Sequence, residues 1–249
     1  MERSDWETLV EQAPVRDLKG RVWRIVESQE QKATTDLVSD LEKQGILEDL
    51  LDQSKPPYPD GSQNLHYLLS TPFRYPPLQW GSRFGNRFEP SLFYASFEIE
   101  TMLAEKAYYQ FLFWQGMETP LPSGKIISQH NVFSVTFHAN PALELQTEPF
   151  EPYQDILQSR DDYRSSQTLG SVLRGKGIEG FTFTSARCPK KGLNAALFTP
   201  KALASQTSET EQNWLSDTRP DTVSFRGPEG FFRFGIELFC ENGRISHFQ

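Results

Sequence analysis

The stretch Gly81-Ser-Arg-Phe-Gly-Asn-Arg-Phe-Glu-Pro-Ser-Leu-Phe-Tyr-Ala-Ser-Phe-Glu-Ile-Glu-Thr-Met-Leu-Ala-Glu105 contains the most informative pattern of this chain. It begins as a glycine-rich basic turn, continues as an apolar strand that ends in tyrosine, and passes into a helix. Arg83, Tyr94 and Glu105 lie in these three elements at intervals of eleven residues. The stretch therefore predicts that a guanidinium, an aromatic ring and a carboxylate meet in one site.

The residue types in this stretch suit a small anionic ligand. Gly81 and Gly85 let the backbone approach a phosphate, and the planar guanidinium of Arg83 can bind one through two parallel hydrogen bonds. The ring of Tyr94 can stack on a flat heterocycle. Glu105 shares its predicted helix face with apolar and aromatic residues, which makes it a candidate for a functional carboxylate.

The composition is that of a folded protein with many turns. The 249 residues are 37% hydrophobic and 13% aromatic, which argues against disorder and allows a substantial core. The 17 prolines and 16 glycines favour a mixed α+β layout over a helical bundle. We expect an N-terminal strand and helical elaboration at residues 1–60, packed on a core domain at residues 61–249.

Periodic patterns predict the secondary structure along the chain. Strands are expected at 21–26, 91–96, 132–138, 180–184 and 194–198, and helices at 34–51, 97–115 and 161–177. Residues 65–77 are predicted to form a short apolar segment that runs into an extended loop, and residues 204–220 a polar surface loop or frayed helix. The C-terminal residues 230–247 predict a hairpin that turns at Asn242-Gly243.

Charge and absent motifs argue against several classes of function. The formal net charge of −8 provides no overall positive field for binding nucleic acid directly. The four histidines lack the spacing of metal ligands, so we expect no metal site. The sequence contains neither GxGxxG nor GxxxxGK[ST]. Because it also lacks a signal-peptide core and an apolar run of ~18 residues, we expect no membrane association and a cytoplasmic location.

Taken together, five segments resemble the RES-domain family, which is named for Arg, Glu and Ser. They are Gly81-Ser-Arg-Phe-Gly85, Phe93-Tyr-Ala-Ser96, Thr101-Met-Leu-Ala-Glu105, Phe183-Thr-Ser-Ala-Arg187 and Asn194-Ala-Ala-Leu-Phe198. Their order and spacing are more specific than any one segment. One departure is Phe84-Gly85, which stands where many members of the family carry Trp-Asn.

The resemblance implies a set of site residues. The four that correspond to the family's Arg, Tyr, Glu and Ser are, in that order, Arg83, Tyr94, Glu105 and Ser185. We interpret Ser185 as a hydrogen-bonding contact to the ligand, because the chain has no GxSxG elbow for a serine nucleophile.

Further residues are candidates for ligand binding. The resemblance implies an upstream arginine that contacts the ligand, and it falls on either Arg24 or Arg74. Gly85, in the basic turn, and Asn194, which either assists Ser185 or holds its turn, complete the set.

The resemblance also implies a fold related to ADP-ribosyltransferases and an activity that consumes NAD⁺. NAD would then be the substrate, and no cofactor is expected. The implied reaction is cleavage of the nicotinamide–ribose bond by an NAD phosphorylase or glycohydrolase. Many members look like the toxin of a toxin–antitoxin pair, whose partner is an Xre-type helix-turn-helix antitoxin.

Two alternatives to this reading stay open at the level of sequence. The first is a mono-ADP-ribosyltransferase that uses the same cleft to modify a protein target. The second is a non-catalytic nucleotide-binding or interaction module. The acceptor of the ADP-ribosyl group (water, phosphate or a protein side chain) also stays open.

Overall fold

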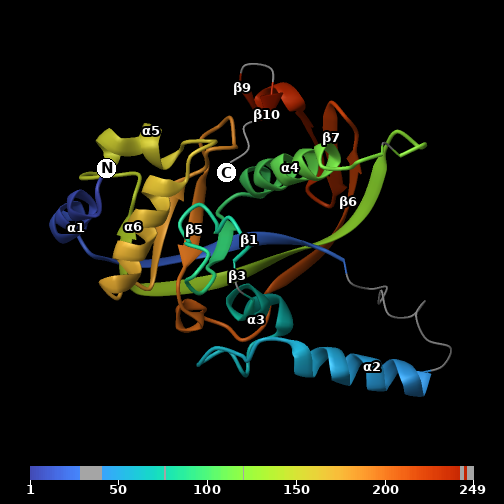
Figure 1. The fold of residues 1–249 in the computed structure, drawn as a ribbon, viewed down its shortest axis with the longest axis horizontal. Coiled ribbons are helices and arrows are strands. Elements are labelled where there is room, and N and C mark those ends of the chain that lie inside the picture. The colour runs from blue at the N-terminus through green and yellow to red at the C-terminus, as the bar shows by residue number, and fades with distance from the viewer. Residues whose placement is uncertain (29–40, 76, 120, 242–243, 246–249) are drawn as a thin grey trace.

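A computed structural model describes residues 1–28, 41–75, 77–119, 121–241 and 244–245. These residues form an α+β structure with one large sheet and flanking helices, as predicted (Figure 1). The strands of the large sheet are β1 (Arg16–Glu27), β2 (Phe93–Ser96), β3 (Ile126–Glu144), β4 (Gly180–Thr184), β5 (Leu193–Leu197), β6 (Thr210–Thr218), β7 (Thr222–Gly227) and β8 (Gly230–Gly235). A small second sheet pairs β9 (Cys240–Glu241) with β10 (Arg244–Ile245).

The large sheet closes on itself over part of its width. Its order is β1-β2-β5-β4-β3-β6-β7-β8, and β1 also pairs with β3. Strands β1, β2, β5, β4 and β3 therefore form a ring, and β6 to β8 extend the sheet from β3. The 19-residue β3 makes this possible because it is long enough to pair with β1, β4 and β6. Only the β3–β4 pair is parallel among the described strands.

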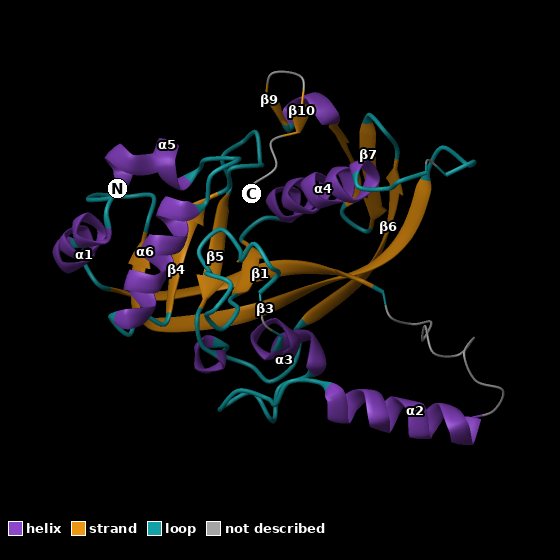
Figure 2. Ribbon diagram, in the orientation of Figure 1, coloured by secondary structure: helices purple, strands orange, loops and turns teal. Residues whose placement is uncertain are grey.

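Helices cover the sheet in separate places (Figure 2). They are α1 (Arg3–Gln12), α2 (Leu41–Ser54), α3 (Tyr67–Arg74), α4 (Ile99–Gln115), α5 (Gln154–Leu157) and α6 (Arg164–Gly175). In Figure 1, α4 and α3 lie on opposite sides of β1 and β3, and each packs in its own hydrophobic cluster. Helices α1 and α6 contribute to a third cluster. None of the described helices combines the length and apolarity needed to cross a membrane.

The predicted strands and the two long downstream helices are confirmed, and differences lie elsewhere. Residues 204–220 contain β6, whose nine residues pair with β3, so the expectation of a surface loop or frayed helix is wrong. The polar side chains of β6 alternate with buried ones such as Trp214 and Ser216, a period that the overall polarity hides. Residues 65–77 contain α3 in place of an extended segment.

Two expectations fall partly outside the described residues. The helix expected at 34–51 is described from Leu41 to Ser54, and residues 34–40 lie outside the description. The C-terminal turn at Asn242-Gly243 also lies outside it, although β9 and β10 pair as an antiparallel hairpin requires. The expectation is wrong for residues 230–235, which form β8 and pair with β7 in a hairpin that the sequence did not predict.

The N-terminal segment contributes directly to the sheet. Strand β1 precedes residue 60, yet it pairs with β3 from Arg16 to Glu27 and with β2 at Trp23. The division at residue 60 stays a prediction, but the sheet itself crosses that position. By contrast, α2 lies at the periphery of the molecule (Figures 1 and 2).

Candidate active site

A pocket of about 320 Å³ opens between β1, β2, the 82–83 turn and one face of α4. Met102, Glu105, Lys106 and Tyr109 line it, and their spacing of three and four residues places them on one side of the helix. The opposite side of α4 is buried and contains Leu103, Ala107 and Phe111. The volume lies within the range of roughly 300–1,000 Å³ found for small-molecule pockets.

The basic turn presents Arg83 to this pocket. Ser82 and Gly85 form an isolated antiparallel bridge, so Arg83 and Phe84 occupy the tip of a tight turn. Gly81 precedes the turn with φ 76°, and a Cβ there would lie 2.4 Å from the carbonyl oxygen of Gly85. Glycine is therefore required at this position by backbone conformation and by space. Gly85 shapes the turn but does not line the pocket.

Three hydrogen bonds hold the Arg83 guanidinium. Nη1 donates to the backbone oxygens of Leu157 (3.0 Å) and Ser159 (2.7 Å), and Nη2 donates to Oη of Tyr163 (3.2 Å). The guanidinium carbon also lies 4.4 Å from the centre of the Tyr163 ring. Since a guanidinium has five N–H groups, two of them, on Nε and Nη2, remain for a ligand. These are suited to the two parallel bonds by which arginine binds a phosphate.

The hydroxyl of Tyr94 ties β2 to the same turn. It accepts a hydrogen bond from the backbone N–H of Phe84 (3.0 Å) and shares one with the Ser82 hydroxyl (2.9 Å). Burial raises the pKa of Tyr94 to about 12, so the phenol stays protonated at neutral pH. The ring lines the pocket and packs edge-to-face on Phe183, with the ring centroids 6.3 Å apart.

Glu105 is held by one of its two carboxylate oxygens. Oε1 accepts hydrogen bonds from the Ser185 hydroxyl (2.6 Å) and from Nδ2 of Asn194 (3.0 Å). In turn, Oδ1 of Asn194 accepts a bond from the Ser96 hydroxyl (2.6 Å), which fixes the orientation of the amide. Ser96 and Asn194 are directly opposed in the β2–β5 register. Oε2 of Glu105 has no hydrogen-bond partner among the described residues and is left for a ligand.

Ser185 lies beneath Glu105 and does not line the pocket. Its side chain is fully buried, and its oxygen accepts the backbone N–H groups of Arg187 (3.2 Å) and Cys188 (2.9 Å). The single hydroxyl hydrogen goes to Glu105, so the bonding capacity of Ser185 is full. The structure thus gives Ser185 the carboxylate as its partner, where the sequence interpretation expected a ligand.

The two upstream arginines differ in their position. Arg24 of β1 lines the pocket, and its Nη1 donates to the backbone oxygen of Tyr94 (2.5 Å). Burial lowers the pKa of Arg24 to about 10, which still leaves it charged at neutral pH. Arg74 is not among the pocket residues; its Nε donates to the oxygen of Pro56 (2.7 Å) and its guanidinium covers the ring of Tyr58.

Sequence reasoning missed three residues that shape this site, namely Lys106, Tyr163 and Arg187. Lys106 lines the pocket together with Glu105, and the sequence contains a signal for it, because Met102 and Tyr109 lie four residues before it and three residues after it on α4. Tyr163 also lines the pocket, and its hydroxyl accepts bonds from both Arg83 and Arg187. No local pattern reveals the contact of Tyr163 with Arg83 and Arg187, because these residues come from separate segments of the chain.

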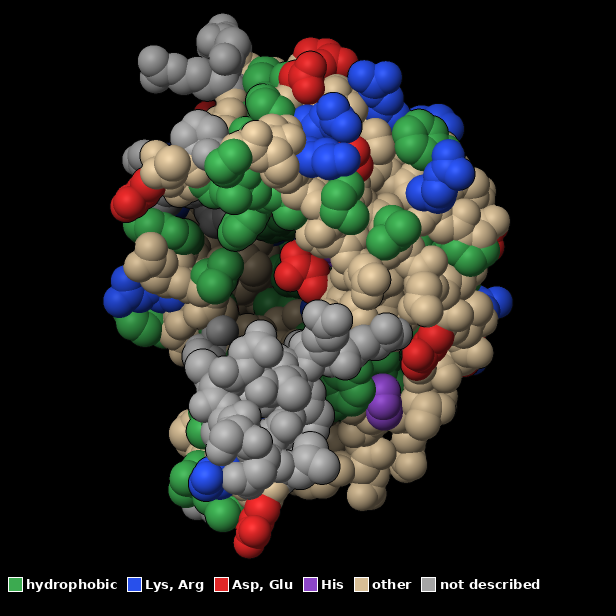
Figure 3. All heavy atoms as spheres, turned by 90° about the vertical axis from the view of Figure 1, so that its right-hand side faces the viewer, with side chains coloured by type: hydrophobic (Ala, Val, Ile, Leu, Met, Phe, Trp, Pro, Cys, Tyr) green, Lys and Arg blue, Asp and Glu red, His purple; other side chains and the backbone are tan. Residues whose placement is uncertain are grey.

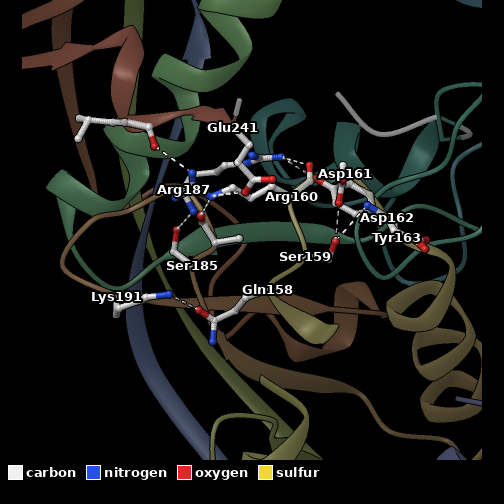
Figure 4. Close-up of polar contacts among 12 residues, drawn as sticks. Gln158, Ser159, Arg160, Asp161, Asp162, Tyr163, Ser185, Arg187, Lys191 and Glu241 are labelled. Atoms are coloured by element: carbon white, nitrogen blue, oxygen red, sulfur yellow. Dashed lines mark hydrogen bonds and ion pairs between the residues drawn. The ribbon is translucent and has the colours of Figure 1, made fainter. Parts of the chain in front are cut away.

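Arg187 is a buried cation close to the site. Its side chain is 1% exposed, its guanidinium carbon lies 3.6 Å from the centre of the Tyr108 ring, and Nη2 donates to the backbone oxygen of Arg160 (2.7 Å). Figure 4 shows Arg187 between Ser185 and the segment that contains Ser159 and Arg160. This segment therefore has contacts to both Arg83 and Arg187.

The pocket is positively charged although the chain as a whole is acidic. Arg24, Arg83 and Lys106 line it together with a single carboxylate, Glu105. The lining therefore carries a net charge of +2, against −8 for the chain. Such local charge favours an anionic ligand. Among the described residues, no three His, Cys, Asp or Glu side chains gather as metal ligands would.

Fold and pocket together define an α+β protein with a cationic small-molecule pocket that contains one ordered carboxylate. A family model described as the RES domain matches residues 59–217, which is more than half of the 249 residues. The chain belongs to the RES domain family, and the resemblance seen in its sequence is confirmed. Arg24 lies outside the matched segment.

No curated protein sequence matches the chain. A chain from the crystal structure of the M. tuberculosis MbcT–MbcA toxin–antitoxin complex is similar to it with a TM-score of 0.49 and 10% sequence identity. The similarity covers 86% of this chain and 92% of that chain.

Proposed function

We propose that this protein is an NAD-consuming enzyme that cleaves the nicotinamide–ribose bond, as a phosphorylase or a glycohydrolase, and that it acts as the toxin of a toxin–antitoxin pair. One observation supports this most directly: Arg83 and Glu105 line the same pocket. An enzyme that cleaves the glycosidic bond of a dinucleotide needs a side chain that binds the phosphates and an ordered carboxylate near the ribose. This cavity contains both types of group.

The reaction proposed for this pocket breaks the bond between ribose C1′ and the nicotinamide nitrogen. The electron pair of that bond stays on the nitrogen, which was positively charged, so nicotinamide leaves as a neutral molecule without a general acid. The ribose is left with oxocarbenium-like positive charge, as in glycoside hydrolysis. An acceptor oxygen then donates an electron pair to C1′: a phosphate oxyanion does so without losing a proton, and a water molecule releases one proton to solvent.

Glu105 is the group proposed to stabilise that charge. Its Oε1 is fixed by Ser185 and Asn194, so Oε2 is held in one direction without further reorganisation. A preorganised carboxylate of this kind stabilises developing positive charge more than a mobile one does. In the proposed complex, Oε2 bonds the ribose hydroxyls and lies close to C1′.

The remaining pocket residues are assigned to binding. Arg83 is proposed to bind the pyrophosphate through the two N–H groups that the protein leaves free, with Arg24 as the upstream arginine. The ring of Tyr94 is proposed to face the nicotinamide, while its hydroxyl keeps the turn that carries Arg83 in place. NAD is then a substrate, and the proposal requires no separate cofactor.

A protein partner is part of this proposal. Tyr109 lines the pocket and is 48% exposed, and Phe113, one turn further along α4, is 61% exposed. Exposed apolar side chains that lie together mark interaction surfaces, and Figure 3 shows hydrophobic side chains around a hollow on one face of the molecule. We infer that an Xre-type helix-turn-helix antitoxin covers the entrance, as the family resemblance implies.

Nicotinamide release tests the proposed reaction. Purified protein is mixed with NAD⁺, with and without inorganic phosphate, and nicotinamide is measured by chromatography. Glu105→Gln is expected to lower the rate by about 10²-fold, equivalent to roughly 3 kcal/mol of transition-state stabilisation. Glu100→Gln is the matched control, since Glu100 lies on the same helix, pairs with Lys190 (2.6 Å) and does not line the pocket.

The outcomes separate the candidate functions. Release that depends on phosphate indicates a phosphorylase, and release in its absence indicates a glycohydrolase. A mass increase on a protein target indicates the mono-ADP-ribosyltransferase alternative. Binding of NAD⁺ without any product would leave the non-catalytic module, and equal release by wild type and Glu105→Gln would remove Glu105 from the chemistry.

A further inference from the structure

Lys106 differs from the other two cations of the pocket in its bonding. Arg24 and Arg83 already donate to backbone oxygens. Lys106 has one partner among the described residues, the carboxylate of Glu27, at 3.4 Å. Among the described residues, its ammonium therefore pairs with a side chain and with no backbone oxygen.

The Lys106–Glu27 pair is easily exchanged. The side chain of Lys106 is 20% exposed, whereas that of Glu27, the last residue of β1, is 63% exposed. Ion pairs with a solvated partner contribute little to stability, because water screens them and both side chains lose freedom. An anion that enters the pocket can therefore replace Glu27 at small cost. A free phosphate, which carries up to two negative charges, attracts the ammonium more strongly than one carboxylate does. The pyrophosphate of a dinucleotide carries one negative charge on each of its two phosphates.

Lys106 is also placed next to the proposed chemistry. Lys106 and Glu105 line the same pocket from neighbouring positions of α4, so an anion bound by Lys106 lies in the cavity that contains the Glu105 carboxylate. The flexible four-carbon stem of lysine allows the ammonium to move between partners, which the planar fork of arginine does less readily.

We propose that Lys106 is the third anion-binding side chain of this pocket. When a ligand binds, the Lys106 ammonium leaves the Glu27 carboxylate and pairs with a phosphate oxygen of the ligand. This proposal rests on the function proposed above. Its ligand is a phosphate group, which belongs either to the dinucleotide or to a free phosphate that serves as acceptor.

Equilibrium binding tests the proposal in a Glu105→Gln background, where substrate is not consumed. The probes are NAD⁺, ADP-ribose and inorganic phosphate at low salt. Lys106→Met is expected to lower the affinity for at least one probe tenfold or more. Lys106→Arg is expected to retain most of the affinity, because it keeps the positive charge. Glu27→Gln is expected to bind as tightly as the parent or more tightly. Lys19→Met, which removes a β1 lysine paired with Asp17 outside the pocket, is the matched control.

The pattern of losses identifies the source of the phosphate. If Lys106→Met binds NAD⁺ and ADP-ribose more weakly but inorganic phosphate with unchanged affinity, Lys106 is assigned to a phosphate of the nucleotide. If it binds inorganic phosphate more weakly, Lys106 is assigned to a free phosphate. Equal affinities of Lys106→Met and the parent for every probe that binds would overturn the proposal while leaving the proposed function intact. Failure of both the wild type and the parent to bind any of the three probes would overturn the proposal and the proposed function together. Thermal melts of each variant exclude loss of folding as the cause.

Discussion

The Ser185 hydroxyl donates its only hydrogen to Oε1 of Glu105 over 2.6 Å, although 80 residues separate the two in the chain. The same oxygen of Ser185 accepts two backbone N–H groups, so the direction of that hydrogen is determined by the protein. This arrangement makes Ser185 part of the support of the carboxylate. It also sets the expected outcome of several substitutions.

Ser185→Ala is expected to lower kcat about tenfold and to leave KM for NAD⁺ nearly unchanged. The substitution removes one of the two hydrogen-bond donors to Glu105, and a tenfold decrease in kcat corresponds to roughly 1.4 kcal/mol of activation free energy. It removes no group that lines the pocket. Steady-state kinetics distinguishes the roles, because a serine that bonds the ligand in ground and transition states alike would raise KM instead. Ser205→Ala, at a partly exposed loop serine outside the pocket, is a suitable control.

Tyr94→Phe separates the ring of this residue from its hydroxyl. The ring is retained, but the buried Phe84 N–H loses its acceptor, and the expected cost is about 1–3 kcal/mol in the free energy of unfolding. Affinity for NAD⁺ is also expected to fall, because the turn that carries Arg83 is no longer tied to β2. Urea unfolding and equilibrium binding measure the two effects. Unchanged stability would show that the hydroxyl does not hold the turn.

Arg83→Ala is expected to weaken NAD⁺ binding more than Arg83→Lys does. Lysine retains the positive charge in the pocket, but it cannot bond the carbonyls of Leu157 and Ser159 and a phosphate at once, as the guanidinium fork does. The expected order of affinity is therefore Arg, then Lys, then Ala. Equal affinities for the two variants would remove Arg83 from the phosphate-binding role.

Stability is expected to decrease in mild acid because of His130. Burial lowers the pKa of this histidine to about 4, and its Nε2 lies 2.8 Å from the Ser216 hydroxyl. In the unfolded chain a histidine has a pKa near 6.5, so between these two values the unfolded state binds more protons. The free energy of unfolding then falls as pH decreases from about 6.5 to about 4, by up to about 3 kcal/mol from this group.

Unfolding of His130→Gln at several pH values checks this contribution. The variant is expected to lose less stability than wild type between pH 7 and pH 4.5, whatever its stability at neutral pH. The same slope in His130→Gln as in wild type would contradict the assignment.

The sequence determined the features that depend on local spacing. The turn, the strand and the helix that carry Arg83, Tyr94 and Glu105 follow from glycine placement and apolar periodicity within 25 residues. The α+β class and most strands follow in the same way. Lys106 was missed, although Met102 and Tyr109, four residues before it and three residues after it, lie on its side of the helix and line the same pocket.

Only the tertiary structure decided how these residues are supported. Asn194 and Ser185 reach Glu105 from 89 and 80 residues away through the register of β2 with β5 and the turn after β4. Whether Arg24 or Arg74 lines the pocket depended on β1 being a central strand, and β6 was hidden by its polar face. Hydrogen bonds act over about 3 Å, so partners far apart in sequence are set by packing and strand register, which no local pattern contains.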